Sequence, residues 1–256
     1  MKSPLATLDR FLARRLLDRW TTAAQSAPLD ELSLLRDRRD AARRLRGQLD
    51  RLLFVAEDRL AMPRIGSNSF PKPPGTHWSW RPPLWRGPVS PAAFAGVISG
   101  QVIGPSVKVF HDCTRSEMTF RQIRNTRDDD LAAYGLQLDT LGFDGSFLSV
   151  AIDLTDDARD GLRKRDILQL HMLAEAERPT TLFARLNIKC GPNTGQVVQE
   201  LKVTKGDVTA DFDLAYADFT ESRIDGLWFD LIVDTPAMNR IRWLDLTVCR
   251  YPRAEI

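Results

Sequence analysis

The sequence predicts a mainly β protein: an antiparallel β-sandwich of jelly-roll type, preceded by an N-terminal helical hairpin or coiled coil. Three observations support this fold class. Short segments that alternate apolar and polar residues fill the second half of the chain, turn residues separate them, and the N-terminal part repeats apolar residues at helical spacing. We therefore predict three regions: helices over 1–62, a linker or wrap over 63–105, and a sandwich over 106–256.

The N-terminal region is predicted to hold helices over 3–25 and 29–61. In the second helix, apolar residues recur three and four positions apart, which is typical of a helical hairpin or coiled-coil seam. The members of this seam are Ala42, Leu45, Leu49, Leu52 and Ala56. Pro63 then ends the helix. We expect Leu45, Leu49 and Leu52 to contact a protein partner or a second copy of the chain.

The segment 63–105 is rich in proline and tryptophan. Eight of the 15 prolines lie between Pro63 and Pro91, and three of the six tryptophans lie in the same stretch. Proline makes a segment stiff and extended, but a simple spacer needs no tryptophan. Trp78, Trp80 and Trp85 therefore either attach this segment to the following domain or bind a partner.

The third region reads as a series of short strands. Predicted strands cover 107–111, 117–123, 135–141, 146–154, 166–174, 180–190, 196–203, 207–214, 226–233 and 240–250. A short helix is predicted over 156–164. Turn signals such as Asp144-Gly145, Gly191-Pro192 and Lys205-Gly206-Asp207 separate the strands. About ten short strands with few helical intervals favour an antiparallel sandwich or jelly roll.

Composition limits the classes of protein to which the chain can belong. With 43% hydrophobic and 27% charged residues, it is typical of a globular protein. It has neither an export signal nor an apolar run of about 18 residues, so we expect a cytoplasmic location. The three cysteines lie far apart and form no CxxC pair, so we expect reduced thiols, no metal site and no cofactor.

Charge is distributed unevenly along the chain. Residues 1–127 hold 22 of the 36 Lys and Arg but 11 of the 34 Asp and Glu. This asymmetry indicates an acidic partner for the first half, or contact between the halves. The basic amphipathic helix within 1–25 also suits an anionic membrane surface, which would place the protein at the periphery of the inner membrane. Nucleic acid is not the expected partner, because acidic residues interrupt the basic helices and no reader motif is present.

The common catalytic motifs are missing. The sequence has no GxxxxGK[ST], no GxGxxG after a strand, no HExxH and no GxSxG. The run His111-Asp112-Cys113 and the acidic residues on the strands remain the candidates for catalysis. They leave open an enzyme of unrecognised type acting on a carbohydrate, but the sequence favours a protein that is not an enzyme, and we assign no catalytic residue.

A mixed aromatic and polar face is the more suggestive feature. If the apolar residues of each strand face the core, then Arg185 and Asn187, Trp228 and Asp230, and Trp243 face outward. Aromatic rings that stack on sugar C–H faces, beside polar groups that bind hydroxyls, are typical of glycan recognition. The alternative is that the linker or the helices cover this face, because exposed tryptophan is uncommon.

These observations lead to three functional hypotheses. The first is a non-catalytic binding or assembly protein whose helices contact other proteins and whose sandwich supplies a recognition face. The second is a glycan-binding β-sandwich, with Trp228, Trp243, Arg185, Asn187 and Asp230 as the tentative site. The third is the unrecognised carbohydrate-active enzyme.

Several stretches also resemble a family of uncharacterised proteins from alphaproteobacteria of the Rhodobacter type. They are FPKPPGTHWSWRPPLWRGP (70–88), FHDCTRSEMTFRQIRNT (110–126), FDGSFLSVAIDL (143–154), ARLNIKCGPNT (184–194) and PAMNRIRWLDLTVCRYPRAEI (236–256). The resemblance covers the chain from about residue 70 to its end and implies no particular chemistry. At the level of the fold, the sandwich also resembles galactose-binding and carbohydrate-binding modules.

Overall fold

The protein is described by a computed structural model that covers residues 4–61, 70–127 and 129–253, with side chains in 14–52, 70–127 and 129–253. The chain forms two units, Met1–Val55 and Ala56–Ile256. The predicted boundary between 62 and 63 lies outside the described residues, as do the first residues of the segment expected to meet a membrane.

The first unit is helical. α1 (Pro4–Ser26) leads through a short 3-10 helix, η1 (Ala27–Leu29), into α2 (Leu32–Ala61), whose last residues belong to the second unit. At the corner, Arg38 donates to Ser26 Oγ at 2.8 Å and pairs with Asp30. No described helix has an apolar stretch long enough to span a bilayer. The two helices fit the predicted hairpin, while a coiled coil stays a prediction.

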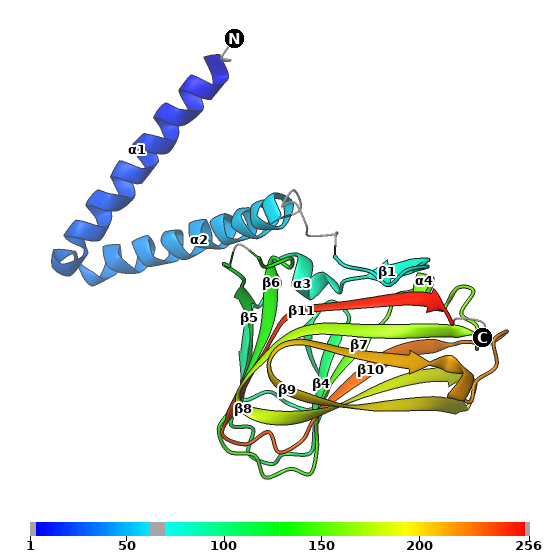
Figure 1. The fold of residues 1–256 in the computed structure, drawn as a ribbon. Coiled ribbons are helices and arrows are strands. Elements are labelled where there is room, and N and C mark those ends of the chain that lie inside the picture. Colours follow the sequence, from blue (N-terminus) through cyan, green and yellow to red (C-terminus); the bar gives the residue numbers. More distant parts are fainter. Residues whose placement is uncertain (1–3, 62–69, 128, 254–256) are drawn as a thin grey trace. The chain divides into compact units, whose positions relative to one another are not determined.

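The second unit is mostly β, which confirms the mainly β part of the predicted fold class (Figure 1). Its strands are β1 (Trp78–Trp80), β2 (Ala93–Ala95), β3 (Gln101–Gly104), β4 (Val107–His111), β5 (Met118–Arg124), β6 (Tyr134–Thr140), β7 (Leu148–Asp153), β8 (Asp166–Cys190), β9 (Asn193–Asp213), β10 (Gly226–Val233) and β11 (Asn239–Pro252). The short helices are α3 (Pro83–Arg86), α4 (Asp156–Arg159) and η2 (Leu214–Tyr216).

All strand pairs are antiparallel, and they form one sheet in the order β2-β5-β6-β11-β8-β10-β7-β4-β3, with β9 beside β8 and β1 beside β11. β8 pairs with β11 through residues 166–176 and with β10 through 182–189. The sheet therefore folds over at β8 and nearly closes into a barrel-like sandwich.

The long hairpin of β8 and β9 corrects the prediction of separate strands. Residues 166–174 and 180–190 belong to one strand, and so do 196–203 and 207–214. The expected turn at Lys205-Gly206-Asp207 is instead part of a bend, at which the pairing of β8 with β9 shifts register between Glu175 and Thr180. A local irregularity lets a strand bend without losing its partner, so both strands pass from one layer of the sandwich to the other (Figure 1).

The core lies between the two layers and follows the alternation of the strands. Leu182, Ala184, Leu186 and Ile188 of β8 are all fully buried, and Phe212 of β9 meets Phe229 of β10 with ring centroids 5.1 Å apart. The segment predicted as a linker or wrap contributes to this core, because Leu84 and Trp85 of α3 are buried in it. It also adds β1, β2 and β3 to the sheet.

Candidate functional site

Four of the five predicted glycan-site residues lie together on the outer face of β8 and β10. In the register of these strands, Trp228 is opposite Asn187 and Asp230 is opposite Arg185. Their neighbours Leu186 and Phe229 are fully buried, so these four side chains point away from the core. We call Arg185, Asn187, Trp228 and Asp230 the β8–β10 face.

Hydrogen bonds join the polar members of this face. Arg185 donates from Nη2 and Nε to Asp230 Oδ2, at 2.7 and 3.2 Å. Asn187 Nδ2 donates to the same oxygen at 2.9 Å, and Gln196 Nε2 of β9 donates to Asn187 Oδ1 at 2.9 Å. Asp230 is only 7% exposed, and the half-buried Trp228 is opposite Asn187 of this polar cluster. The cluster thus has defined geometry before any ligand arrives.

The outer face continues beyond the predicted residues. Lys108 of β4 pairs with Asp153 of β7, which is opposite Trp228, with Nζ and Oδ2 3.0 Å apart. Phe110 of β4 and Val198 of β9 add exposed apolar surface. Sequence analysis missed Gln196, Lys108 and Phe110 as members of this surface, because the pairing of β4 with β7 and of β9 with β8 joins them to it. The pattern of a single strand does not show which strands lie next to it.

Trp243 is not part of this face, and its predicted outward position is wrong. The residue is 1% exposed and lies in the core. The pairing of β11 with β8 shifts register between Trp243 and Asp245. Before this shift the odd-numbered residues, such as Trp243, face the core; after it the even-numbered residues, such as Leu246, do. The Trp243 carbonyl accepts a hydrogen bond from Trp85 Nε1 at 2.8 Å.

The tryptophans of the predicted linker pack against the β-domain itself. Trp78 and Trp80 are half-buried and lie on β1, which pairs with β11. Trp85 is 1% exposed, so the hypothesis that it binds a partner is corrected: its ring is inside the core. The neighbouring Arg81 forms a buried, bidentate ion pair with Asp245, with N–O distances of 2.8 and 2.7 Å.

The predicted seam leucines of α2 lie at the surface of the helical unit. Leu49 and Leu52 are 49% and 64% exposed, and Leu45 is half-buried. They do not gather into a buried cluster within the described residues. Their assignment as partner-binding residues stays a prediction.

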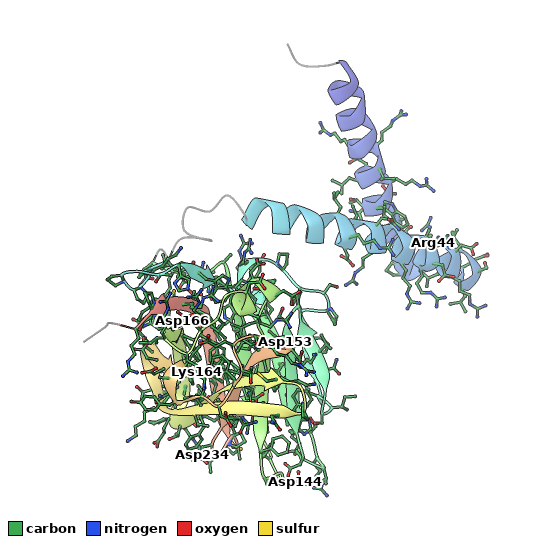
Figure 2. The ribbon with its side chains drawn as sticks, turned by 90° about the vertical axis from the view of Figure 1, so that its right-hand side faces the viewer. Arg44, Asp144, Asp153, Lys164, Asp166 and Asp234 are labelled. Atoms are coloured by element: carbon green, nitrogen blue, oxygen red, sulfur yellow. The ribbon has the colours of Figure 1, made fainter. Side chains whose placement is uncertain are left out.

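The run His111-Asp112-Cys113 forms hydrogen bonds to two neighbouring loops, at Val97 and at residues 144–146. His111 Nε2 lies 2.9 Å from the Val97 carbonyl, and Asp112 accepts hydrogen bonds from Ser146. Cys113 Sγ donates to Asp144 Oδ1 at 2.7 Å. Burial and this hydrogen bond raise the pKa of the Cys113 thiol, which disfavours the nucleophilic thiolate. Asp144, at the end of the β-domain opposite Asp166, thus fixes a loop in place (Figure 2).

The described residues contain no group of three or more His, Cys, Asp or Glu side chains placed to hold a metal ion. They do contain two adjoining clefts, of about 350 and 190 Å³, on the outer face of β5, β6, β11 and β8. The clefts share Glu175 and Arg242. We call them together the arginine cleft; its arginines are Arg121, Arg124, Arg127, Arg240 and Arg242.

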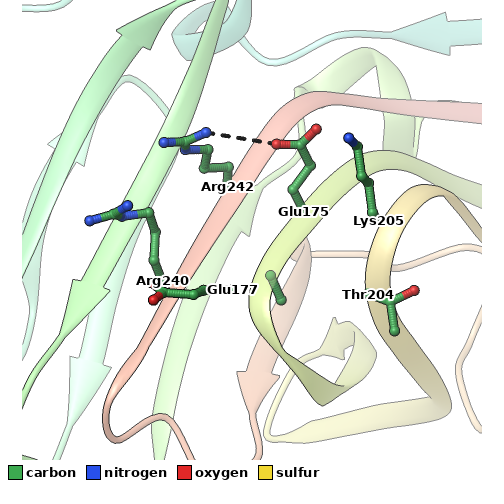
Figure 3. A pocket seen from close by; sticks show the side chains of 7 residues that line it. Glu175, Glu177, Thr204, Lys205, Arg240 and Arg242 are labelled. Atoms are coloured by element: carbon green, nitrogen blue, oxygen red, sulfur yellow. Dashed lines mark ion pairs between the residues drawn. The ribbon is translucent and has the colours of Figure 1, made fainter.

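Strand pairing aligns the charged side chains of this cleft in one row. Arg121 of β5 is opposite Gln137 of β6, which is opposite Arg242 of β11. Arg242 is opposite Glu175 of β8, which is opposite Lys205 of β9. Figure 3 shows Arg242, Glu175 and Lys205 from these three strands side by side, with the ion pair between Arg242 and Glu175.

Carboxylates and amides hold the arginines in place. Arg242 Nε donates to Gln137 Oε1 at 3.0 Å, and Arg127 Nη1 donates to Glu175 Oε1 at 3.2 Å. Arg240 Nε donates to Asp139 Oδ1 at 2.6 Å. Burial acts to raise the pKa of Asp139, but the hydrogen bonds from Arg240 and Gln137 outweigh it, so the pKa is lowered and the carboxylate is charged. Sequence analysis did not identify this cleft, because its residues come from five strands.

A glycine lets β6 and β11 approach each other beside the cleft. At Gly135, a Cβ atom would lie 2.9 Å from the Trp243 carbonyl oxygen and 3.2 Å from Asn125 Oδ1. Asn125 Nδ2 donates to the carbonyls of Ala132, Tyr134 and Leu244, at 3.0, 3.2 and 2.7 Å. Asn125 therefore ties the turn between β5 and β6 to β11.

Solved structures with some likeness to the chain include two carbohydrate-binding modules. One is the CBM22-1 xylan-binding domain of Paenibacillus barcinonensis Xyn10C, with 10% identity, a TM-score of 0.39 and coverage of 63% of this chain and 94% of that domain. Another is the family 11 module of Clostridium thermocellum, with 10% identity, a TM-score of 0.38 and coverage of 64% and 97%.

A third likeness is to the enzymatically active domain of tailspike protein 4 of bacteriophage CBA120, with 10% identity and a TM-score of 0.41; it covers 56% of this chain and 19% of that one. No match was found among curated proteins. A family model, by contrast, matches residues 1–256 in full, which confirms the resemblance to uncharacterised proteins. The chain belongs to the family of unknown function DUF6478.

Proposed function

We propose that the protein is a non-catalytic binding protein and that its β8–β10 face binds a glycan. The observation that carries this proposal is the position of Trp228, opposite Asn187 and on the same outer face as the hydrogen-bonded cluster of Arg185, Asn187 and Asp230. An aromatic ring can stack on the C–H face of a sugar, while fixed donors and acceptors bind its hydroxyls. A cluster that is already ordered loses little side-chain entropy on binding.

Calorimetric titration tests this proposal. Cello-, xylo- and β-1,3-gluco-oligosaccharides are titrated into the full chain, and the best ligand is then titrated into Trp228→Ala. We expect a loss of at least roughly ten-fold in affinity, equal to about 1.4 kcal/mol, with the fold retained because the ring lies outside the core. Tyr216→Ala is the matched control, because Tyr216 is an exposed aromatic residue away from this face. If no oligosaccharide binds and Trp228→Ala only lowers thermal stability, the face is structural.

The helical unit supports a second candidate function, assembly with another protein. Its supporting observation is the set of exposed leucines on α1 and α2: Leu16, Leu17, Leu32, Leu34, Leu49 and Leu52. Exposed apolar side chains on helices are typical of helix-mediated contacts. Sedimentation of the full chain and of a chain that begins at residue 70 tests this function. Equal assembly states and equal partners for the two would refute it.

A further inference from the structure

The arginine cleft carries an excess of positive charge. The larger of its two parts is lined by Arg121, Arg124, Arg127 and Arg242, against two carboxylates, Asp130 and Glu175. Arg124 forms no ion pair with any described residue. Like charges gathered in one concave site repel one another, and a bound anion relieves that repulsion. The cleft therefore has the charge of an anion site.

The carboxylates lie deeper than the guanidinium groups. The Asp130 and Glu175 side chains are 7% and 21% exposed, whereas those of Arg121, Arg127 and Arg242 are 49%, 45% and 39% exposed. A guanidinium has five N–H donors, and the bonds to these carboxylates and to Gln137 use only some of them. Arg127 and Arg242 are thus held by buried or half-buried partners and keep donors for a ligand.

Two of these arginines converge. Arg127, from the turn after β5, and Arg242, from β11, both approach the Glu175 carboxylate, with N–O distances of 3.2 and 3.8 Å. Two guanidinium groups near one carboxylate lie within reach of one further anion, since the charge-assisted bonds of arginine to oxyanions are short and directional. Asn125, which is 5% exposed, anchors the segment that carries Arg124 and Arg127, so the donors are preorganised.

The cleft and the β8–β10 face differ in chemistry. Apart from the aliphatic Ile123 and Leu244, the larger part of the cleft is lined by polar and charged residues and by no aromatic ring. A neutral sugar would find no stacking surface here, whereas an anion finds several donors. We propose that the arginine cleft is a second binding site, for the oxyanion group, a carboxylate, sulfate or phosphate, of a small ligand held by Arg124, Arg127 and Arg242. This site is independent of glycan binding at the β8–β10 face.

Nuclear magnetic resonance of the ¹⁵N-labelled full chain tests the proposal. Sodium sulfate, sodium phosphate and sodium glucuronate are titrated separately at constant ionic strength, and the arginine Nε–H signals are followed. We expect saturable shifts for Arg127 and Arg242 and no shift for the exposed Arg165 in the turn before β8. Sulfate and phosphate without glucuronate would identify a tetrahedral anion, and glucuronate alone would identify a carboxylate.

Two variants and one control complete the experiment. Arg242→Gln and Arg124→Gln should each weaken binding by roughly five-fold or more, since each removes a charged donor. Arg165→Gln changes the net charge by the same amount and should leave binding unchanged. If Arg242→Gln fails to fold, Arg124→Gln decides, because Arg124 is exposed and has no described partner. The absence of saturable shifts with all three anions, or an equal loss in Arg165→Gln, would overturn the proposal.

Discussion

The tryptophan of α3 should be the residue of the Pro/Trp-rich segment on which the β-domain depends most. Trp85 is 1% exposed, and its indole N–H donates to the Trp243 carbonyl at 2.8 Å. A buried tryptophan removes about 150–250 Å² from water, or roughly 4–6 kcal/mol at about 25 cal/mol per Å². Measured losses for such truncations are about 3–5 kcal/mol, because the site partly collapses. We expect Trp85→Ala to lower the free energy of unfolding by about 4 kcal/mol.

Urea unfolding followed by near-UV circular dichroism measures this loss. Trp85→Phe is the matched control, because it keeps an aromatic ring and removes the hydrogen bond to Trp243. It should lose less, about 1–3 kcal/mol. Trp80→Ala, at a half-buried position on β1, should also lose less than Trp85→Ala. A loss below about 1 kcal/mol for Trp85→Ala, or one equal to that of Trp80→Ala, would refute the reasoning from burial.

Three other predictions follow from the structure. A chain that begins at residue 106 should not fold, since it lacks β1 and α3, whereas one that begins at residue 70 should give the native circular dichroism spectrum. Burial and Asp211 raise the pKa of Tyr251 to about 12 from 10.0, so the folded state holds the phenol proton more tightly than the unfolded chain. Stability should therefore fall as the pH rises from about 10 to about 12, and in Tyr251→Phe the fall in urea midpoint should be smaller. Because burial and Asp144 raise the pKa of Cys113, Asp144→Asn should speed its reaction with a thiol reagent at pH 8, and an unchanged rate would contradict this cause.

Alternation along single strands was the part of the fold that the sequence predicted best. β4 (107–111) and β10 (226–233) have the predicted bounds, and β8 and β10 turn Arg185, Asn187, Trp228 and Asp230 outward as expected. These segments keep a strict period of two through the predicted residues, so one inward residue fixes the side of all the others.

The errors have physical causes that single-strand patterns do not contain. Trp243 was placed outward because the register shift before Asp245 changes the alternation, and no residue type in the sequence marks it. The arginine cleft was missed because Arg121, Arg242 and Glu175 become neighbours only through the pairing of β5, β6, β11 and β8. β1 and β2 are three residues long, which is too short to show a period.

The bent hairpin of β8 and β9 has a consequence for how the domain folds. Its pairs join residues near in sequence, from Cys190 with Asn193 outward to Ile167 with Asp213. β1 and β11, by contrast, pair Trp78 with Arg250. Closing a short loop costs less chain entropy than closing a long one, so we expect the hairpin to form first and the non-local strands to pair with it afterwards. Since β8 pairs with β11 in one layer and with β10 in the other, loss of either layer removes pairing from the same strand, and we expect the sandwich to unfold as a single cooperative unit.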